Sequence, residues 1–349
     1  MDFICRMVAR TRRTITSLMV FAAIGLVSSC MPGGAVDTAH SQTITVYGFS
    51  IMKEVMEKEI YPKFKAKWKR EHGVDLDFVS SFAGSETVTN QILQGAPADL
   101  AILSIDREAQ RLFDGKATAK DWHAYPNKGI INKTPFVILV RKGNPKSIHD
   151  FADLAKPGVK VIHPDPISSG GAQWSILSIY GSELKKSEAA TGSADPARAL
   201  STLQAIWKNV ISTPGSAREA RTQFETGYGD ALITYELEGL LMKSENAPIE
   251  VVIPRSTIFS EHPVVMIDRQ VDASKRPVVE AFINYLWTDE AQKAFVKYHF
   301  RSVTNESFNN ENKEFVKIEL PFTVDMFGGW SRAYPDIIEK VFRDTVQRK

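Results

Sequence analysis

The segment GVKVIHPDPISSGGAQW, from Gly158 to Trp174, is the most informative part of the sequence. Its first half predicts a strand and a proline-bounded turn, and Ser168-Ser169-Gly170-Gly171 predicts the start of a helix. The first N–H groups of a helix have no partner within it, and the helix dipole makes that end weakly positive. Glycines let an outside group approach the backbone, and serine adds a hydroxyl donor. The segment therefore predicts a site for a small anion that needs no lysine or arginine in contact with it.

Strand and helix patterns alternate along the chain from Thr43 onward. Segments with strand character include residues 44–47, 74–79, 98–104, 135–141, 229–235, 251–254 and 264–267, and residues from Pro277 onward are mainly helical. The polar residues 187–195 predict a loop. This alternation predicts an α/β fold with mostly parallel sheets.

The chain is long enough for two domains. It is expected to cross between two α/β lobes near Thr134-Pro135 and near 254–256. The first lobe then comprises residues 43–134 and 257–349, and the second comprises residues 135–256. Ligands bind at the carboxyl ends of the strands in open sheets, so we expect the binding site in the cleft between the lobes.

Other short turns share the pattern of the Ser-Gly segment. Phe49-Ser50, Ala83-Gly84-Ser85 and 214–217 (PGSA) each stand where a strand or loop leads into a helix. Two of the four turns fall in each predicted lobe, so that together they would surround an anion with N–H and hydroxyl donors. Ordinary helix capping is the alternative for any single turn.

Several motifs resemble the sulfate/thiosulfate-binding proteins that serve bacterial ABC importers. They are FVILVRKGNPK (136–146), PDP with SSGGA (164–172), GDALIT (229–234) and FGGW (327–330). The resemblance extends from about Ile44 to Trp330. It implies the type II periplasmic binding protein fold, in which two lobes on a hinge close on a dehydrated sulfate.

The resemblance also implies roles for single residues. Ser169 gives a hydroxyl hydrogen bond, Gly170 and Gly171 give N–H groups, and Ser85 gives an N–H group of the second turn. Ala217 matches a small residue before an arginine, which is Arg218 here. The implied anion site is therefore Ser169, Gly170, Gly171, Ser85, Ala217, Tyr235, Ser50 and Phe49.

The sequence departs from the family pattern at this site. Tyr235 stands where the family has an indole donor, Gln173 where it has an arginine, and Phe49-Ser50 where it has an aspartate. Glu86 directly follows Ser85, and it either faces the cleft or stabilises its own helix as a first-turn acid. Sulfate is the favoured ligand, and thiosulfate, phosphate and molybdate are alternatives.

The N-terminus predicts export. Arginines precede an apolar run from Ile15 to Val27, as in a signal peptide, so residues 1–30 form a leader and residues 31–42 a linker. Val27-Ser28-Ser29-Cys30 resembles the bacterial lipoprotein box, which implies a lipid tether at Cys30. Ordinary cleavage of the signal peptide further along the chain is the alternative. The predicted location is the periplasm.

Composition and motifs exclude several other functions. The net charge of +2 gives no basis for nucleic-acid binding. The cysteines, Cys5 and Cys30, both lie in the leader, and the seven histidines have no metal-ligand spacing. We therefore expect no catalytic residue, metal or cofactor. The resemblance implies that the protein delivers its ligand to ABC permease subunits, and we expect it to be a monomer. A periplasmic phosphate- or sulfate-ester hydrolase and a sensory subunit are the alternatives.

Overall fold

The computed structural model describes residues 41–119 and 121–347. The predicted leader, Cys30 and most of the predicted linker lie outside the described residues. No helix in the described part is long and apolar enough to cross a membrane.

Ten strands form one connected set of β-ladders. Their bounds are β1 (Gln42–Phe49), β2 (Leu76–Ala83), β3 (Leu100–Ile102), β4 (Ile130–Arg141), β5 (Val161–Ile162), β6 (Val210–Ser212), β7 (Ala231–Tyr235), β8 (Ile249–Val252), β9 (Ser256–Met266) and β10 (Leu320–Phe322). The strand order is β2-β1-β3-β9-β4-β7-β5-β6, with β10 beside β9 and β8 beside β4.

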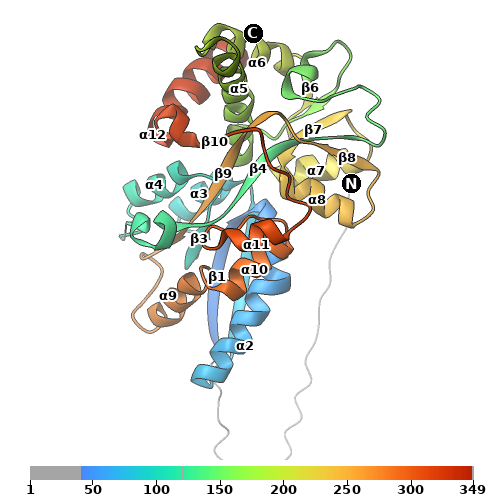
Figure 1. Cartoon of the computed structure of the whole chain (residues 1–349). Helices are drawn as coiled ribbons and strands as arrows, with labels where there is room; N and C mark the ends of the chain where they lie inside the picture. The colour runs from blue at the N-terminus through green and yellow to red at the C-terminus, as the bar shows by residue number, and fades with distance from the viewer. Residues whose placement is uncertain (1–40, 120, 348–349) are drawn as a thin grey trace, which may run out of the picture. The chain divides into compact units, whose positions relative to one another are not determined.

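The long strands β4 and β9 connect two groups of strands. The first group is β2, β1 and β3, and the second is β7, β5, β6 and β8. They pair antiparallel with each other, as Figure 1 shows near the middle of the molecule. β4 pairs with β9 up to Pro135 and with β7 from Phe136 onward. The pairs β1–β2, β1–β3, β5–β6 and β5–β7 are parallel. The predicted α/β class is therefore confirmed, and the antiparallel pairs all involve β4 or β9.

Helices cover both groups of strands. Those before β4 are η1 (Ser50–Met52), α1 (Lys53–Val55), η2 (Met56–Ile60), α2 (Tyr61–His72), α3 (Ser85–Leu93), α4 (Asp106–Asp114), η3 (Trp122–Ala124) and η4 (Pro126–Gly129). Those between β4 and β9 are η5 (Phe151–Ala155), α5 (Gly170–Thr191), α6 (Pro196–Trp207), α7 (Ala217–Glu225) and α8 (Glu236–Ser244). The last are α9 (Arg276–Tyr285), α10 (Asp289–Lys297), α11 (Glu306–Glu311), η6 (Val324–Phe327), α12 (Trp330–Ala333) and η7 (Tyr334–Gln347).

Helix α5 corrects the predicted loop at 187–195. The helix continues through Thr191 and ends where Gly192 takes a left-handed conformation with φ of 83°. Its last residues, KKSEAAT, are polar because that end is largely exposed, and most of them also favour a helix. Polarity alone therefore pointed to a loop where the chain is still helical.

The C-terminal segment covers α5 and α6. Trp330 meets Trp174 of α5 edge to face at 4.6 Å between ring centroids, and Phe342 meets Trp207 of α6 in the same way at 4.6 Å. Residues 320–347, which the sequence assigned to the first lobe, thus contact helices assigned to the second. The lobe boundaries stay a prediction.

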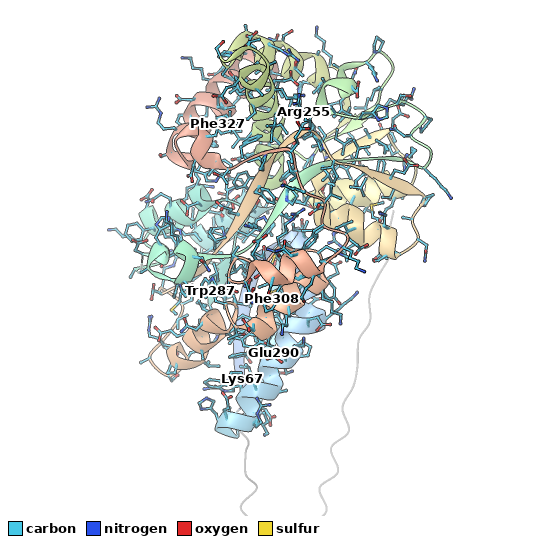
Figure 2. All side chains as sticks on the ribbon, viewed as in Figure 1. Lys67, Arg255, Trp287, Glu290, Phe308 and Phe327 are labelled. Atoms are coloured by element: carbon cyan, nitrogen blue, oxygen red, sulfur yellow. The ribbon has the colours of Figure 1, made fainter. Side chains whose placement is uncertain are left out.

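Indole and imidazole groups fix several loops in the core. Trp287, labelled in Figure 2, donates from Nε1 to the Ile130 carbonyl at 2.8 Å. His163 is buried between the Pro164 carbonyl, 2.7 Å from Nδ1, and the Ser175 hydroxyl at Nε2. Burial lowers the pKa of His163 to about 4, so the ring is neutral and packs at the end of β5.

A buried ion pair joins the first residue of α8, which directly follows β7, to the chain after α10. Arg301 donates to both carboxylate oxygens of Glu236 at 2.9 Å, and its backbone bridges to Lys133 of β4. Burial raises the pKa of Glu236 to about 7, and Arg301 opposes this shift only in part.

We predict that Glu236 makes stability fall as pH rises. The folded protein holds this proton more tightly than the unfolded chain, so this contribution is complete below about pH 4.5 and is lost as pH rises through about 7. The slope is at most about 1.4 kcal/mol per pH unit. Urea unfolding at several pH values should show that Glu236→Gln removes this component, and an unchanged slope would contradict the prediction.

Candidate functional site

The four predicted turns come together in the structure. A Cβ atom on Gly84 would lie 2.3 Å from the Ser168 carbonyl oxygen and 2.6 Å from that of Gly215. The second, third and fourth turns are therefore in direct backbone contact. The first turn joins them because the Arg218 N–H donates to the Ser50 hydroxyl at 3.4 Å.

Each turn is placed by the secondary structure around it. β1 ends at Phe49 and β2 at Ala83, and η1 and α3 begin directly after these strands. Gly170 and Ala217 are the first residues of α5 and α7. The first residues of these helices, whose N–H groups have no partner within their own helix, therefore lie in one region.

The glycine pair of α5 lies against side chains from other elements. A Cβ on Gly171 would lie 2.7 Å from the Tyr235 hydroxyl. A Cβ on Gly170 would lie 2.8 Å from the Ser104 Cβ and 2.9 Å from Glu108 Oε1. Only glycine permits this close approach, which explains the Gly-Gly pair in structural terms.

All eight predicted site residues are buried. The Tyr235 hydroxyl is within 2.8 Å of the Ser104 hydroxyl, and burial raises the pKa of this phenol, so it is neutral. Hydrogen bonds inside such a site act in a low effective dielectric, which strengthens their interaction with a charged ligand. The structure thus brings the predicted residues together, and their contact with a ligand stays a prediction.

Sequence reasoning missed two members of this cluster, Ser104 and Glu108. The Ser85 hydroxyl donates to Glu108 Oε2, and the Ser104 N–H donates to the Ser85 hydroxyl at 2.9 Å. Ser104 follows the carboxyl end of β3, and ligands bind at the carboxyl ends of strands in open sheets. This position could have been recognised from the sequence. Glu108 reads in the sequence as an ordinary first-turn acid of α4.

Glu86 has cationic partners beside this cluster. It forms ion pairs with Arg107, at 2.7 Å, and with Arg111, and Gln173 donates to it at 3.1 Å. It also stands in the first turn of α3, the position predicted for an acid that stabilises its own helix. The Arg107 and Arg111 charges therefore compensate the carboxylate.

A cluster of charges supports the start of α7. Arg218 pairs with Glu54 of α1 and, at 2.9 Å, with Glu238 of α8, whereas Arg221 binds Glu238 at 3.2 Å and also contacts Glu245. Burial raises the pKa of Glu238, and the two arginines oppose that shift. Through Arg218 the cluster fixes Ala217 against the first turn.

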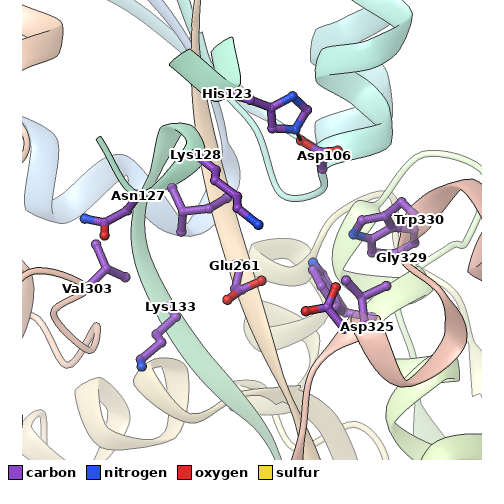
Figure 3. Close-up of a pocket in the computed structure, with 13 residues that line it drawn as sticks. Asp106, His123, Asn127, Lys128, Lys133, Glu261, Val303, Asp325, Gly329 and Trp330 are labelled. Atoms are coloured by element: carbon purple, nitrogen blue, oxygen red, sulfur yellow. Dashed lines mark hydrogen bonds and ion pairs between the residues drawn. The ribbon is translucent and has the colours of Figure 1, made fainter. Parts of the chain in front are cut away.

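A separate pocket of about 480 Å³ does not include the glycine pair in its lining. Figure 3 shows its mixed lining, with Glu261, Asp325 and Asp106 opposite Lys128 and Lys133. Burial raises the pKa of Glu261. The three carboxylates of this mixed lining do not favour an anion. Among residues 41–119 and 121–347, no group of three or more histidine, cysteine, aspartate or glutamate side chains is placed to hold a metal ion.

Residues 44–301 match the sequence model of a family described as bacterial extracellular solute-binding protein. The chain belongs to this family. The sulfate-binding protein of Synechococcus elongatus is 31% identical over 336 residues, which cover 94% of each chain. The thiosulfate-binding protein of Escherichia coli is 32% identical over 92% of this chain and 93% of its own length.

Solved structures agree with this assignment. The sulfate-binding protein SubI from Mycobacterium tuberculosis superposes with a TM-score of 0.76 at 28% identity, over 84% of this chain and 98% of its own. A periplasmic thiamin-binding protein shares the fold with a TM-score of 0.63 at 14% identity, over 86% of this chain and 96% of its own. The predicted family and fold are confirmed.

We predict that Glu238→Ala destabilises the protein by about 3–5 kcal/mol, because it leaves Arg218 and Arg221 of α7 without their shared buried carboxylate. Glu245→Ala removes a more exposed partner of Arg221 and should cost less than about 1 kcal/mol. Chemical denaturation measures both, and equal losses would contradict the assigned role of Glu238.

Proposed function

We propose that this protein captures sulfate, or the related thiosulfate, between two lobes and delivers it to an ABC importer. The contact of three turns around Gly84 is the observation that carries the proposal. The proposed ligands of the anion are Ser169, Gly170, Gly171, Ser85, Ala217, Tyr235, Ser50 and Phe49. The sulfate- and thiosulfate-binding relatives support this choice of ligand.

Uncharged donors suit a fully ionised anion. Hydrogen bonds to charged groups are about twice as strong as neutral ones, and N–H groups at the start of α5 and α7 add the favourable end of each helix dipole. Since sulfate carries no proton near neutral pH, donors are more useful to it than acceptors.

We further propose that binding closes the two lobes about β4 and β9. The turns at Phe49 and Gly84 belong to the first lobe, and those at Gly170 and Ala217 to the second. Closure would bring them together around the ligand, as in hinge-type binding proteins. The exchange of strand partners at Pro135 and Phe136 supports a hinge at this point.

The remaining properties follow from the same proposal. The protein is exported to the periplasm, acts as a monomer, binds permease subunits in the membrane and has no enzymatic activity. A lipid on Cys30 would tether it to the membrane. Mass spectrometry of the mature protein and its size in solution test these points.

Calorimetric titration of the purified protein tests the ligand. We expect sulfate or thiosulfate to bind more tightly than phosphate and molybdate. Gly171→Asp should abolish binding, because it places a carboxylate beside the Tyr235 hydroxyl and against the anion. Undiminished affinity in this variant would refute the site, and a preference for phosphate would refute the choice of ligand.

Gly84→Ala tests closure separately from folding. Gly84 has φ of −60° and ψ of 140°, which alanine adopts readily, so ligand-free stability should change by less than about 1 kcal/mol. Its Cβ would nevertheless collide with two backbone carbonyls in the arrangement seen in the structure, which we take as the proposed closed form. We expect sulfate affinity to fall by at least about tenfold. Unchanged affinity would show that the turns do not close in this way.

A further inference from the structure

We propose that Glu108 is an additional ligand of the bound anion and donates a hydrogen bond from Oε1 as the neutral carboxylic acid. This proposal rests on the proposed capture of a sulfate-like anion. It assigns to the site a residue that sequence reasoning did not identify.

The two carboxyl oxygens of Glu108 have different surroundings. Oε2 accepts from the Ser85 hydroxyl and from the N–H groups of Ser104 and Ile105, the latter two at 3.2 Å. Oε1 is buried and has no hydrogen-bond partner among the described residues. Because Oε2 has only donors around it, the acid proton belongs on Oε1.

Oε1 also lies beside Gly170, a residue of the predicted anion site. It would lie 2.9 Å from a Cβ on Gly170, which is the first residue of α5. The Ser104 hydroxyl would lie 3.0 Å from the same Cβ and is within 2.8 Å of the Tyr235 hydroxyl. An O–H group at this position adds one more donor beside those of the helix start.

Neighbouring charges favour the protonated acid. The groups that face Glu108 are Glu86 from α3, whose charge Arg107 and Arg111 of α4 compensate, and Tyr235 from β7, which packs against the neutral His262 ring of β9. Helix α5 contributes the uncharged Gln173. Burial is the main cause that raises the pKa of Glu108, followed by the Glu86 charge. A bound dianion would favour the neutral form further.

The alternative is an ionised Glu108, which would repel sulfate and accept a proton from hydrogen phosphate. A neutral Glu108 donates a hydrogen bond to the ligand, whereas an ionised Glu108 can only accept one from it. Sulfate is the decisive probe because it has no titrating proton near neutral pH. Any pH dependence of sulfate binding therefore comes from the protein.

The experiment compares wild type with Glu108→Gln. Glutamine keeps an acceptor for the N–H groups and a donor in place of Oε1–H, but it does not titrate. Sulfate affinity is measured by calorimetry from about pH 5.5 to about pH 9.5. Glu236→Gln is the matched control, because it removes another buried carboxyl with a raised pKa outside this cluster.

We expect Glu108→Gln to bind sulfate within about threefold of wild type at acid pH, since it keeps the donor. Above the pKa of Glu108, wild-type affinity should fall by up to about tenfold per pH unit, and the Glu108→Gln profile should be flat. Glu236→Gln should keep the wild-type profile. A pH dependence that persists in Glu108→Gln would overturn the proposal.

Infrared difference spectra give a readout that does not depend on the measured affinity. Sulfate should shift the carbonyl band of a protonated carboxyl in wild type, and Glu108→Gln should lack this change. Absence of this band in wild type would overturn the proposal. The proposal would also fail if Glu108→Gln bound sulfate at least about tenfold more tightly than wild type and lost phosphate binding, because an ionised Glu108 would then be indicated. If wild type binds no sulfate at any pH, the proposed function itself fails.

Discussion

The close approach of three backbone turns at Gly84 is the constraint on which the site depends. A single added carbon would overlap the carbonyls of Ser168 and Gly215, so the α3 start, the α5 start and the turn before α7 fit together only without a side chain there. The contact brings helix starts into one buried region. No lysine or arginine is needed there to balance an anion, because N–H and O–H dipoles serve instead.

Charged residues are placed around this region. Arg218 and Arg221 pair with Glu238, and Arg107 and Arg111 pair with Glu86, so the nearby ions compensate one another. Such pairs hold the helix starts in position and compensate the full charges beside the proposed anion site. Glu108 is different, because one of its oxygens has only donors and the other has no partner among the described residues.

The sequence predicted the fold class, the family and the convergence of the turns, because each depends on local patterns. Strand ends followed by Ser, Gly or Ala are visible in the sequence, and parallel strands bring such ends to one edge. Glu108 was not predicted, since its role comes from contacts with Ser85 and Gly170 that are far away in the chain. The length of α5 was missed because its exposed end is polar although helical.

The packing of the C-terminal segment has a consequence for how the chain matures. Trp330 and Phe342 cover Trp174 and Trp207, so the apolar sides of α5 and α6 stay uncovered until residues 330–342 have been made. A nascent chain that lacks them exposes large aromatic surfaces. Helices α5 and α6 therefore complete their apolar packing only after all ten strands of the described residues have been made.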